Sequence, residues 1–369
     1  MKIAFDAKRA FSNKSGLGNY SRDIIRGLHE YYPNNTYYLF SPNAQTDLLE
    51  NKYLKNTIFP KAKLKIFKSY WRSFKMANDI DKIKPDIYHG LSNELPKNIA
   101  KTSAKKIVTI HDLIFLKLPH LYKFIDRKIY YKKFQFACNN ADKIIATSEN
   151  TKNDIIEEFK IKPEKIEVVY QSCNSVFLQK YSEKDFERVK EKYKLPQKYI
   201  LTVGTIEERK NALQVLKAIF DFNLDINYVL VGKKTKYLNK IIAWSKEHNI
   251  SHKLHILDNV SNEDLPIIYQ ICEIFAYPSI YEGFGIPILE AFNSGNPVIT
   301  ANTGACSEVA AEAALKVDVS DTKSIGLAIK NILENENLKL ELQEKAKSRA
   351  NDFRLENMLE NLYRVYQNL

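Results

Sequence analysis

The chain has 369 residues, 44% hydrophobic and 27% charged, which is typical of a folded protein and suits two domains of roughly 150–200 residues each. The 4 cysteines stand far apart and only 7 residues are histidines, so the sequence indicates neither a disulfide framework nor a metal site. The net charge is +12, but no nucleic-acid-binding signature accompanies it, and we expect no nucleic-acid partner.

Short apolar runs alternate with amphipathic stretches along the whole chain. This alternation is typical of parallel sheets covered by helices, and two successive runs of it predict an α/β protein with two doubly wound, Rossmann-like domains. Ligands of such domains bind at the carboxyl ends of the strands, which predicts a site in a central cleft. The predicted strands are 2–5, 37–40, 87–88, 106–110, 143–147 and 167–170, followed by 199–203, 228–231, 254–256, 274–277, 297–300 and 315–317.

The polar stretch 172–194 follows the last strand of the first run and predicts the joint between the domains. We therefore assign residues 1–178 to an N-terminal domain and 179–350 to a C-terminal domain. Neither a membrane-spanning apolar run of ~20 residues nor a signal peptide is visible, so we expect a cytoplasmic protein.

Three segments carry candidate binding residues, of which the first is SGLGNY at 15–20, between the first strand and a predicted helix over Tyr20–Tyr31. Gly16 and Gly18 would let the backbone approach a ligand, and a helix N-terminus behind them favours an anion. A tight structural turn explains the glycines equally well. Because a third glycine and a following acidic residue are absent, NAD binding is disfavoured.

The second segment is VGTIEERKN at 203–211, between a strand and a helix. Arg209 and Lys210 stand at the opening of that helix, where the helix macrodipole disfavours cations. A diphosphate held by both side chains would explain their placement. The alternative is that both side chains point into solvent.

The third segment, FAYPSIYEGFGIPILEAFNSGNPVI at 275–299, places Glu282 and Glu290 on either side of a glycine-containing loop. Pro287 predicts that a helix begins there, and the glycines before it would offer backbone N–H groups to phosphate or sugar oxygens. Glu282, on the loop, can accept hydrogen bonds from sugar hydroxyls. Glu290, about one turn into the helix, can take both hydroxyls of a ribose.

Together with HDLI at 111–114 and ATSE at 146–149, these segments resemble glycosyltransferase family 4 in motif order over essentially the whole chain. The sequence looks closest to the mannosyl-, rhamnosyl- and glucosyl-type enzymes of bacterial surface polysaccharides. The resemblance implies a GT-B fold and a retaining, metal-independent hexosyltransferase without a cofactor. It also implies that the N-terminal domain binds the acceptor, that the C-terminal domain binds the nucleotide-sugar donor, and that the C-terminal helix, 351–369, crosses back to the N-terminal domain. One departure is VYQSCN at 169–174, where the family more commonly has a Pro-Asn-Gly turn.

By this resemblance, Arg209 and Lys210 bind the donor diphosphate and neutralise the charge that develops on the leaving nucleotide. Glu282 orients the donor hexose, Glu290 holds the ribose, and His111 lies near the reacting centre. A core histidine at a strand end is the other explanation for His111, and Asp112 is either a helper or a turn residue. The remaining donor-binding positions are Gly16, Gly18, Gly204, Val260, Gly283, Phe284, Gly285 and Ile286.

The route to retention at the anomeric carbon depends on whether a carboxylate is available as a nucleophile. A double displacement needs a carboxylate nucleophile, and both glutamates already have binding roles. We therefore favour same-face attack, with the leaving diphosphate taking the acceptor proton. GDP-mannose is the favoured donor, with UDP-glucose close behind.

The basic excess lies in the N-terminal part of the chain. Residues 1–150 hold 27 Lys+Arg and 13 Asp+Glu, a difference of +14, whereas 151–369 hold 29 and 31, a difference of −2. Basic and aromatic residues mix in two stretches, 59–75 (with Lys61, Lys63, Lys65 and Lys68) and 117–136. Such mixtures suit an anionic membrane surface, and we predict a glycan or polyprenyl-diphosphate acceptor at the inner membrane face. Solvated surface lysines are the alternative.

Other classes of function fit less well. An epimerase of the same fold lacks the Glu-x7-Glu pattern, and a pyridoxal-type phosphorylase needs a longer chain. A catalytically silent scaffold or sensor that binds a nucleotide sugar would not need Glu282, Glu290, Arg209, Lys210 and His111 together. The oligomeric state is not readable from the sequence.

Overall fold

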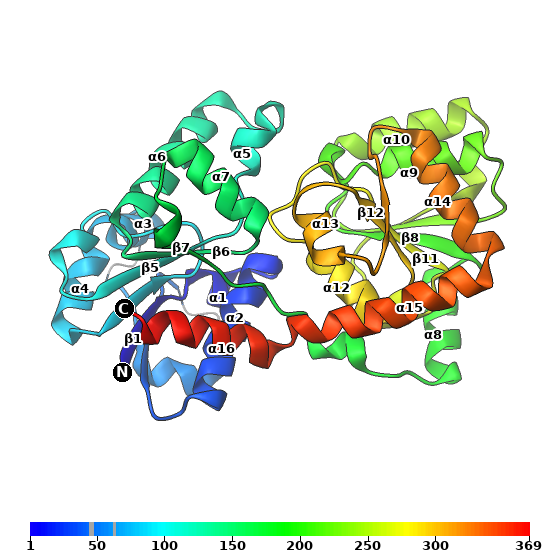
Figure 1. The fold of residues 1–369 in the computed structure, drawn as a ribbon. Coiled ribbons are helices and arrows are strands. Elements are labelled where there is room, and N and C mark those ends of the chain that lie inside the picture. The colour runs from blue at the N-terminus through cyan, green and yellow to red at the C-terminus, as the bar shows by residue number, and fades with distance from the viewer. Residues whose placement is uncertain (44–47, 62–63) are drawn as a thin grey trace. The chain divides into compact units, whose positions relative to one another are not determined.

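The computed structural model describes residues 1–43, 48–61 and 64–369, with Lys65 described by its backbone alone. The chain forms two compact units, Met1–Ser172 with Leu355–Leu369 (unit 1) and Cys173–Arg354 (unit 2). Each contains a parallel sheet between helices (Figure 1), as the predicted fold class requires.

The unit boundaries differ by a few residues from the predicted ones at 178 and 350. Phe177 packs edge-on against Tyr269, with ring centroids 5.4 Å apart, so the segment after Ser172 belongs to unit 2. Phe353 likewise contacts Phe284 of unit 2, at 5.8 Å between ring centroids, so unit 2 extends to Arg354. The predicted joint at 172–194 also contains a regular helix, α8 (Glu183–Tyr193), whose first turn is closed by a capping box between Ser182 and Asp185.

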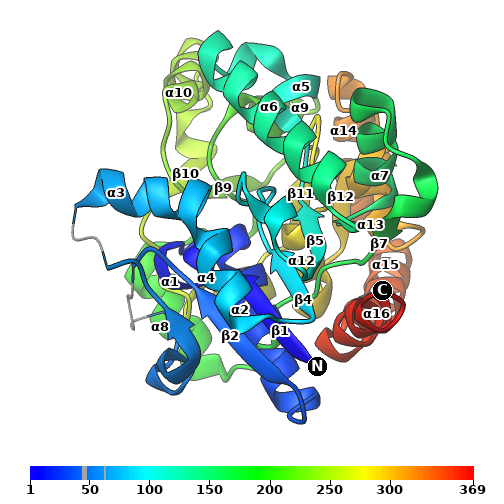
Figure 2. The same ribbon diagram turned by 90° about the vertical axis from the view of Figure 1, so that its left-hand side faces the viewer.

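The sheet of unit 1 has the strand order β3-β2-β1-β4-β5-β6-β7, with parallel pairing throughout. Figure 2 shows β2, β1, β4 and β5 next to one another. Chain order therefore reverses between β1 and β4. The strands are β1 Lys2–Asp6, β2 Thr36–Phe40, β3 Thr57–Ile58, β4 Ile87–Gly90, β5 Lys105–Ile110, β6 Lys143–Ala146 and β7 Ile166–Val168.

Alternate residues of these strands enter two hydrophobic cores, one on each face of the sheet. Ala4 and Tyr88 belong to one core with α4, α6 and α7, whereas Ile3 and Ile87 belong to the other with α2 and α16. The helices of unit 1 are α1 Lys8–Ser12, α2 Gly16–Tyr31, α3 Lys65–Tyr70, α4 Met76–Ile83, α5 Ile114–Lys117, α6 Phe124–Asn140, α7 Glu149–Phe159 and α16 Leu355–Gln367.

The C-terminal helix α16 packs within unit 1, where it lies against α2 (Figure 1). The contact is close because Gly27 of α2 has no side chain. A Cβ atom at this position would lie 2.4 Å from a methyl carbon of Leu359. Within the described residues, no helix has both the length and the apolar character needed to cross a membrane.

The sheet of unit 2 repeats the arrangement with the order β10-β9-β8-β11-β12-β13, again parallel, and chain order reverses between β8 and β11. Its strands are β8 Tyr199–Val203, β9 Asn227–Val231, β10 Leu254–Leu257, β11 Ile274–Tyr277, β12 Val298–Ala301 and β13 Leu315–Val317. Its helices are α8 Glu183–Tyr193, α9 Ala212–Asp221, α10 Tyr237–Glu247, α11 Leu265–Gln270, α12 Ile286–Asn293, α13 Gly304–Ala310, α14 Thr322–Glu334 and α15 Glu336–Ala350.

The SGLGNY segment was predicted as a loop before a helix over Tyr20–Tyr31, and this was wrong in detail. A short helix, α1, follows β1, and α2 already begins at Gly16, so both glycines lie in its first turn. Helix formation extends this far because Ser15 at the N-cap is extended and its carbonyl accepts from Gly18 and Asn19.

Candidate active site

The loop after β8 brings two cations to the carboxyl edge of the unit 2 sheet. Gly204 directly follows β8 and has a φ of +138°, a conformation that favours glycine, and a Cβ atom there would stand 3.5 Å from Cε of Lys210. A short 3-10 turn over Glu208–Lys210 follows, and Asn211, with a φ of 61°, leads into α9. The amide of Ile280 donates to the carbonyl of Arg209 at 2.8 Å, which joins this loop to the one after β11.

One carboxylate oxygen of Glu282 collects three donors. Its Oε1 lies 2.6 Å from Arg209 Nη1 and 2.5 Å from Lys210 Nζ, and it accepts from the Tyr277 hydroxyl at 3.0 Å. Lys210 Nζ also donates to the Tyr277 hydroxyl. Among the described contacts none involves Oε2 of Glu282, so this second oxygen can accept a further hydrogen bond.

Burial makes this cluster electrostatically strong. The side chains of Lys210, Glu282 and Arg209 are only 9%, 10% and 15% exposed. Burial alone would raise the pKa of Glu282, but the adjoining Lys210 and Arg209 outweigh it and lower that pKa to about 2. Glu282 is therefore ionised at neutral pH, and the idea that both cations point into solvent is wrong.

Helix α12 starts where the sequence predicts, directly after the glycine-containing loop. Gly285 has a φ of +130° and precedes Ile286 and Pro287 at the helix start. Gly285, at the N-cap, has no side chain that could cap this first turn. The turn therefore retains the partial positive charge that suits an anion.

Glu290 lies in α12 and faces α11. Its Oε2 accepts a hydrogen bond of 2.7 Å from the Tyr269 hydroxyl. Burial raises the pKa of Glu290 to about 7, although the Tyr269 hydrogen bond acts in the opposite direction. Unlike the carboxyl group of Glu282, which is ionised at neutral pH, that of Glu290 therefore titrates near neutral pH.

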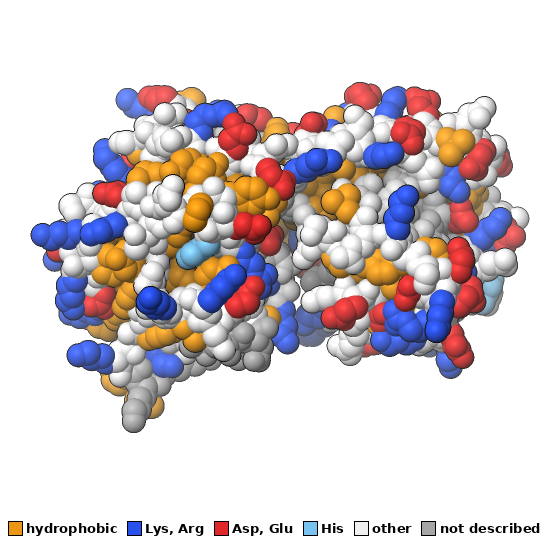
Figure 3. All heavy atoms as spheres, turned by 90° about the horizontal axis from the view of Figure 1, so that it is seen from below, with side chains coloured by type: hydrophobic (Ala, Val, Ile, Leu, Met, Phe, Trp, Pro, Cys, Tyr) orange, Lys and Arg blue, Asp and Glu red, His pale blue; other side chains and the backbone are white. Residues whose placement is uncertain are grey.

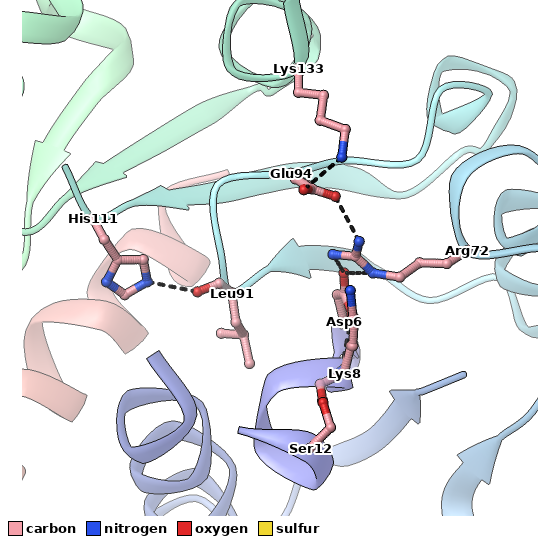
Figure 4. A network of polar contacts seen from close by, with 8 residues as sticks. All are labelled: Asp6, Lys8, Ser12, Arg72, Leu91, Glu94, His111 and Lys133. Atoms are coloured by element: carbon pink, nitrogen blue, oxygen red, sulfur yellow. Dashed lines mark hydrogen bonds and ion pairs between the residues drawn. The ribbon is translucent and has the colours of Figure 1, made fainter. Parts of the chain in front are cut away.

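His111 lies in unit 1, at the carboxyl end of β5, and is 5% exposed. Its Nε2 donates to the carbonyl of Leu91 at 2.9 Å (Figure 4), since a carbonyl can only accept. Burial lowers the pKa of His111 to about 4. The ring is therefore neutral at pH 7 and carries its proton on Nε2, which leaves Nδ1 as an acceptor. Asp112 accepts from the amide of Ile114 at 3.1 Å, the contact of a turn residue.

The two glycines of α2 have different surroundings. A Cβ atom at Gly18 would lie 1.9 Å from the carbonyl oxygen of Asn13, whereas nothing lies within 4 Å of one at Gly16. Arg22 donates to the same Asn13 carbonyl at 2.8 Å. Close packing against the preceding loop thus requires Gly18, as the structural-turn alternative predicts, and a ligand-binding role for either glycine stays a prediction.

The sequence-predicted residues fall into two groups. Glu282, Arg209, Lys210 and Gly204 gather at one edge of the unit 2 sheet, with the start of α12 (Gly283, Phe284, Gly285 and Ile286) on the same loop, whereas His111, Gly16 and Gly18 belong to unit 1. Val260 is half-buried and follows β10 by three residues.

Three residues of this site were not predicted from the sequence. Tyr277 and Tyr269 bind the two glutamates, but both belong to apolar runs that read as core. Gly232, with a φ of +150°, is needed because a Cβ atom there would stand 1.8 Å from the carbonyl oxygen of Gly204. A glycine directly after a predicted strand was the available signal for the last of these.

Two family profiles together match most of the chain. The Glycosyltransferase Family 4 profile matches residues 14–174, and the profile described as Glycosyl transferases group 1 matches residues 183–349. The chain belongs to glycosyltransferase family 4. The family resemblance predicted from the motifs is thereby confirmed.

Two curated relatives of this family 4 chain are named as O-antigen chain mannosyltransferases. It is 29% identical over 290 residues to O-antigen chain mannosyltransferase B of Escherichia coli, a match that covers 77% of this chain and 74% of the relative. It is 31% identical over 226 residues to O-antigen chain mannosyltransferase RfbU of Salmonella typhimurium, with 61% and 60% covered. The match thus spans less than two thirds of the second relative.

Solved structures support the GT-B fold of this family 4 member. A glycosyltransferase from Rickettsia africae superposes with a TM-score of 0.78 at 21% identity, covering 100% of this chain and 98% of the other. Anabaena HepE in complex with UDP superposes with a TM-score of 0.80 at 15% identity, covering 100% of both chains.

Removing the Glu282 carboxylate is expected to destabilise unit 2. Glu282→Ala leaves two buried cations without their shared partner, which should cost about 3 kcal/mol of unfolding free energy. Urea unfolding followed by Trp244 fluorescence in a Trp71→Phe background measures this loss in unit 2. The control is Glu207→Ala, which removes a 33% exposed partner of Arg209 and should cost less than about 1 kcal/mol. Equal losses in both variants would contradict a buried charge cluster.

Glu290 should make stability depend on pH near neutrality. Because its pKa is raised to about 7, the folded chain binds an extra proton between the ordinary carboxyl pKa and pH 7, and stability falls as pH rises through that window. Glu290→Gln should therefore gain up to about 2 kcal/mol relative to the unchanged chain between pH 5 and pH 8, allowing for partial exposure. Melting temperatures across this range measure the effect. Glu344→Gln, at an exposed position, is the control, and identical pH profiles would refute the assignment.

Proposed function

We propose that the chain is a retaining glycosyltransferase that moves a hexose, with mannose favoured, from a nucleotide diphosphate sugar to a glycan or lipid-linked acceptor of a surface polysaccharide. The observation that carries this proposal is the carboxylate of Glu282, held between Arg209 and Lys210 at the carboxyl edge of the unit 2 sheet. Support for the sugar and the pathway comes from the relatives that are named as O-antigen mannosyltransferases.

Arg209 and Lys210 are proposed to bind the diphosphate of the donor. Both side chains lie at the carboxyl ends of the strands. The backbone N–H groups in the first turn of α12 add partial positive charge to theirs. As the bond from the anomeric carbon to the diphosphate oxygen breaks, negative charge grows on the leaving group. Fixed positive groups in a dry site stabilise that charge without reorganising.

Glu282 and Glu290 are proposed to bind the two sugars of the donor. Oε1 of Glu282 is fully occupied by protein donors, which fixes its carboxylate and leaves Oε2 for a hexose hydroxyl. Glu290 accepts from Tyr269 through Oε2, so its other oxygen can accept from the ribose. Because its pKa is about 7, nucleotide affinity should be greater above pH 7 than below it.

His111 is proposed to contact the donor sugar near the reacting carbon. Its neutral ring has an acceptor nitrogen, Nδ1, and its orientation is fixed by the Leu91 carbonyl and by the Tyr20 ring at 4.7 Å between centroids. A neutral imidazole can accept a hydrogen bond from a sugar hydroxyl without opposing the positive charge of an oxocarbenium-like carbon.

We infer same-face substitution for the reaction. The acceptor oxygen bonds to the anomeric carbon on the face that the diphosphate leaves, and the acceptor proton passes to the departing diphosphate oxygen. No divalent ion is required by this scheme, because Arg209 and Lys210 supply the charge. Among the described residues, no group of three His, Cys, Asp or Glu side chains is placed to hold a metal ion.

Peripheral attachment to an anionic membrane is part of the proposal. Large apolar side chains are exposed on two segments of unit 1. The first segment comprises α3 and the π-helical turn Trp71–Lys75, and the second is the start of α6. These side chains are Ile66 at 74%, Phe67 at 55%, Tyr70 at 49% and Phe74 at 41%, followed by Phe124 at 63%, Ile125 at 70%, Ile129 at 45% and Tyr130 at 37%. Lys63 of the predicted basic stretch lies outside the described residues. On the face drawn in Figure 3, by contrast, acidic and basic side chains are interspersed and form no single basic patch.

A donor screen tests the catalytic proposal. The purified chain is assayed by thermal shift and by hydrolysis against GDP-, UDP-, ADP- and dTDP-sugars, with EDTA present. One nucleotide should raise the melting temperature by mass action, and the shift should vanish in Glu290→Ala and weaken in Arg209→Ala with Lys210→Ala. Activity that EDTA abolishes would refute metal independence. A folded protein that responds to no donor would favour the scaffold or sensor alternative.

Vesicle binding tests the membrane proposal. Cosedimentation with phosphatidylglycerol vesicles at low salt should exceed that with phosphatidylcholine vesicles, because lysines and exposed apolar side chains act together. Phe124→Ser with Ile125→Ser should reduce binding at least about fivefold, since apolar burial supplies part of the affinity. Leu327→Ser with Leu340→Ser, at 43% and 52% exposed positions of unit 2, is the control. No binding to anionic vesicles would overturn the idea.

A further inference from the structure

A pocket of about 390 Å³ lies in unit 1, at the carboxyl edge of its sheet. Asp6, the last residue of β1, is at the pocket, and Glu94 reaches it from the loop after β4. The chain can turn back sharply after β4 because Gly90 has no side chain. A Cβ atom there would lie 2.3 Å from the carbonyl oxygen of Glu94. The opposite walls come from the π-helical turn Trp71–Lys75 with the start of α4, and from α6.

The position of the pocket in the topology indicates a ligand site. Doubly wound sheets bind ligands where the chain order of the strands reverses, because the loops of the two central strands diverge there. In unit 2 this point lies between β8 and β11, where the Glu282 cluster stands. In unit 1 the equivalent point lies between β1 and β4, where the pocket opens.

A network of ion pairs forms one wall of the pocket (Figure 4). Arg72 donates to Asp6 Oδ2 through Nε at 2.9 Å and Nη2 at 2.6 Å, and its Nη1 reaches Glu94 at 2.6 Å. Lys133 contacts the other oxygen of Glu94 at 3.1 Å. Burial would raise the pKa of Glu94, but Arg72 and Lys133 lower it to about 2, so the carboxylate is ionised. The buried hydroxyl of Tyr88, close enough to interact with these charges, has no hydrogen-bond partner among the described residues.

The charges of the lining do not balance. Four cations, Arg72, Lys97, Lys132 and Lys133, face two carboxylates, Asp6 and Glu94, an excess of +2. Arg72 pairs with both carboxylates, and Lys133 pairs with Glu94. Within the part of the chain that the structure describes, neither Lys97 nor Lys132 has a carboxylate at ion-pair distance, and both are exposed. This excess predicts an anionic ligand group, such as a phosphate.

The rest of the lining is apolar and requires a second kind of ligand group. Met76, Leu95, Ile129 and Phe136 line the pocket, and Ile129 is 45% exposed. The exposed side chains of Phe74 and Ile125 belong to the same two segments, the turn Trp71–Lys75 and helix α6, that form the pocket walls. A ligand that satisfies both halves of the pocket carries a phosphate on an apolar chain.

We propose that this unit 1 pocket binds the acceptor through its phosphate-bearing, apolar-chained end, with Lys97 and Lys132 as the phosphate ligands. The assignment to the acceptor rests on the proposed glycosyl transfer, which needs a second substrate besides the donor. Asp6 and Glu94 then fix Arg72 at the pocket wall. Ile129 and Phe136 contact the first carbons of the chain.

The test uses calorimetry of the full chain with four probes, farnesyl phosphate, inorganic phosphate, dihexanoyl phosphatidic acid and GDP, below their aggregation concentrations. Farnesyl phosphate should bind more tightly than either inorganic phosphate or phosphatidic acid. Lys97→Ala with Lys132→Ala should weaken it at least about tenfold, since two charged hydrogen bonds are lost. The charge-matched control is Lys101→Ala with Lys128→Ala, two exposed lysines of unit 1 outside the pocket lining, which should change affinity less than about twofold.

A second pair of variants tests the apolar half. Ile129→Ser should weaken farnesyl phosphate and leave inorganic phosphate unchanged. Ile125→Ser, on the same helix and 70% exposed but outside the pocket lining, should change neither. Equal effects of the two serine substitutions would overturn the pocket assignment in favour of a general apolar surface. Tighter binding of phosphatidic acid than of farnesyl phosphate would overturn the acceptor assignment.

Cross-tests separate this proposal from the proposed function. Arg209→Ala with Lys210→Ala should lose GDP and keep farnesyl phosphate, whereas Lys97→Ala with Lys132→Ala should do the reverse. Loss of farnesyl phosphate in the Arg209 and Lys210 variant would place that probe at the nucleotide site and overturn the pocket. If the chain binds neither GDP nor any other nucleotide but still binds farnesyl phosphate, the proposed function would instead be overturned, and the acceptor role with it.

Discussion

The site in unit 2 depends on one shared atom, Oε1 of Glu282. Arg209 and Lys210 come from the loop after β8, Glu282 from the loop after β11, and the two strands are hydrogen-bonded neighbours in the sheet. Two cations this close to each other, largely removed from water, would repel strongly without the carboxylate between them. The backbone bond from Ile280 to Arg209 holds the same two loops together. Positive charge is thereby concentrated and fixed before any ligand arrives, which is the condition for electrostatic stabilisation of a leaving group.

Unit 1 also has a cluster of ion pairs at the point of its sheet where the chain order of the strands reverses. There a central arginine, Arg72, joins Asp6 of β1 to Glu94 after β4, so the signs are reversed: one cation between two carboxylates. The difference matters chemically. In unit 2 the carboxylate retains an unoccupied oxygen beside two cations, which suits a sugar joined to a diphosphate. In unit 1 both carboxylates are paired with cations, and the surplus positive charge lies on Lys97 and Lys132 beside the apolar walls of the pocket. This arrangement suits a phosphate on an apolar chain.

The sequence was sufficient for the features that depend on local pattern. Strands Tyr199–Val203 and Ile274–Tyr277 have the predicted bounds, because continuous apolar runs mark strands buried on both faces. The pairing of Glu282 with Arg209 and Lys210, the contact of Tyr269 with Glu290 and the pocket of unit 1 were not predicted. Each depends on which side chains meet across strands or helices distant in sequence, and a tyrosine in an apolar run looks the same whether or not its hydroxyl has a role. Helix α1 was missed because its five residues are too few to show a periodicity.

The last element of the chain extends this dependence on distant contacts to His111. Tyr366 of α16 reaches through the core to Nδ1 of His89 at 2.7 Å, and Nε2 of His89 contacts Thr109 at 2.8 Å. Thr109 in turn meets the hydroxyl of Tyr20, whose ring packs edge-on against His111. Burial lowers the pKa of His89 to about 3, so the ring is neutral and can donate at one nitrogen while it accepts at the other. These contacts link α16 through His89 and Thr109 to Tyr20, so the docking of α16 supports the ring that packs against His111 from the opposite end of the sequence.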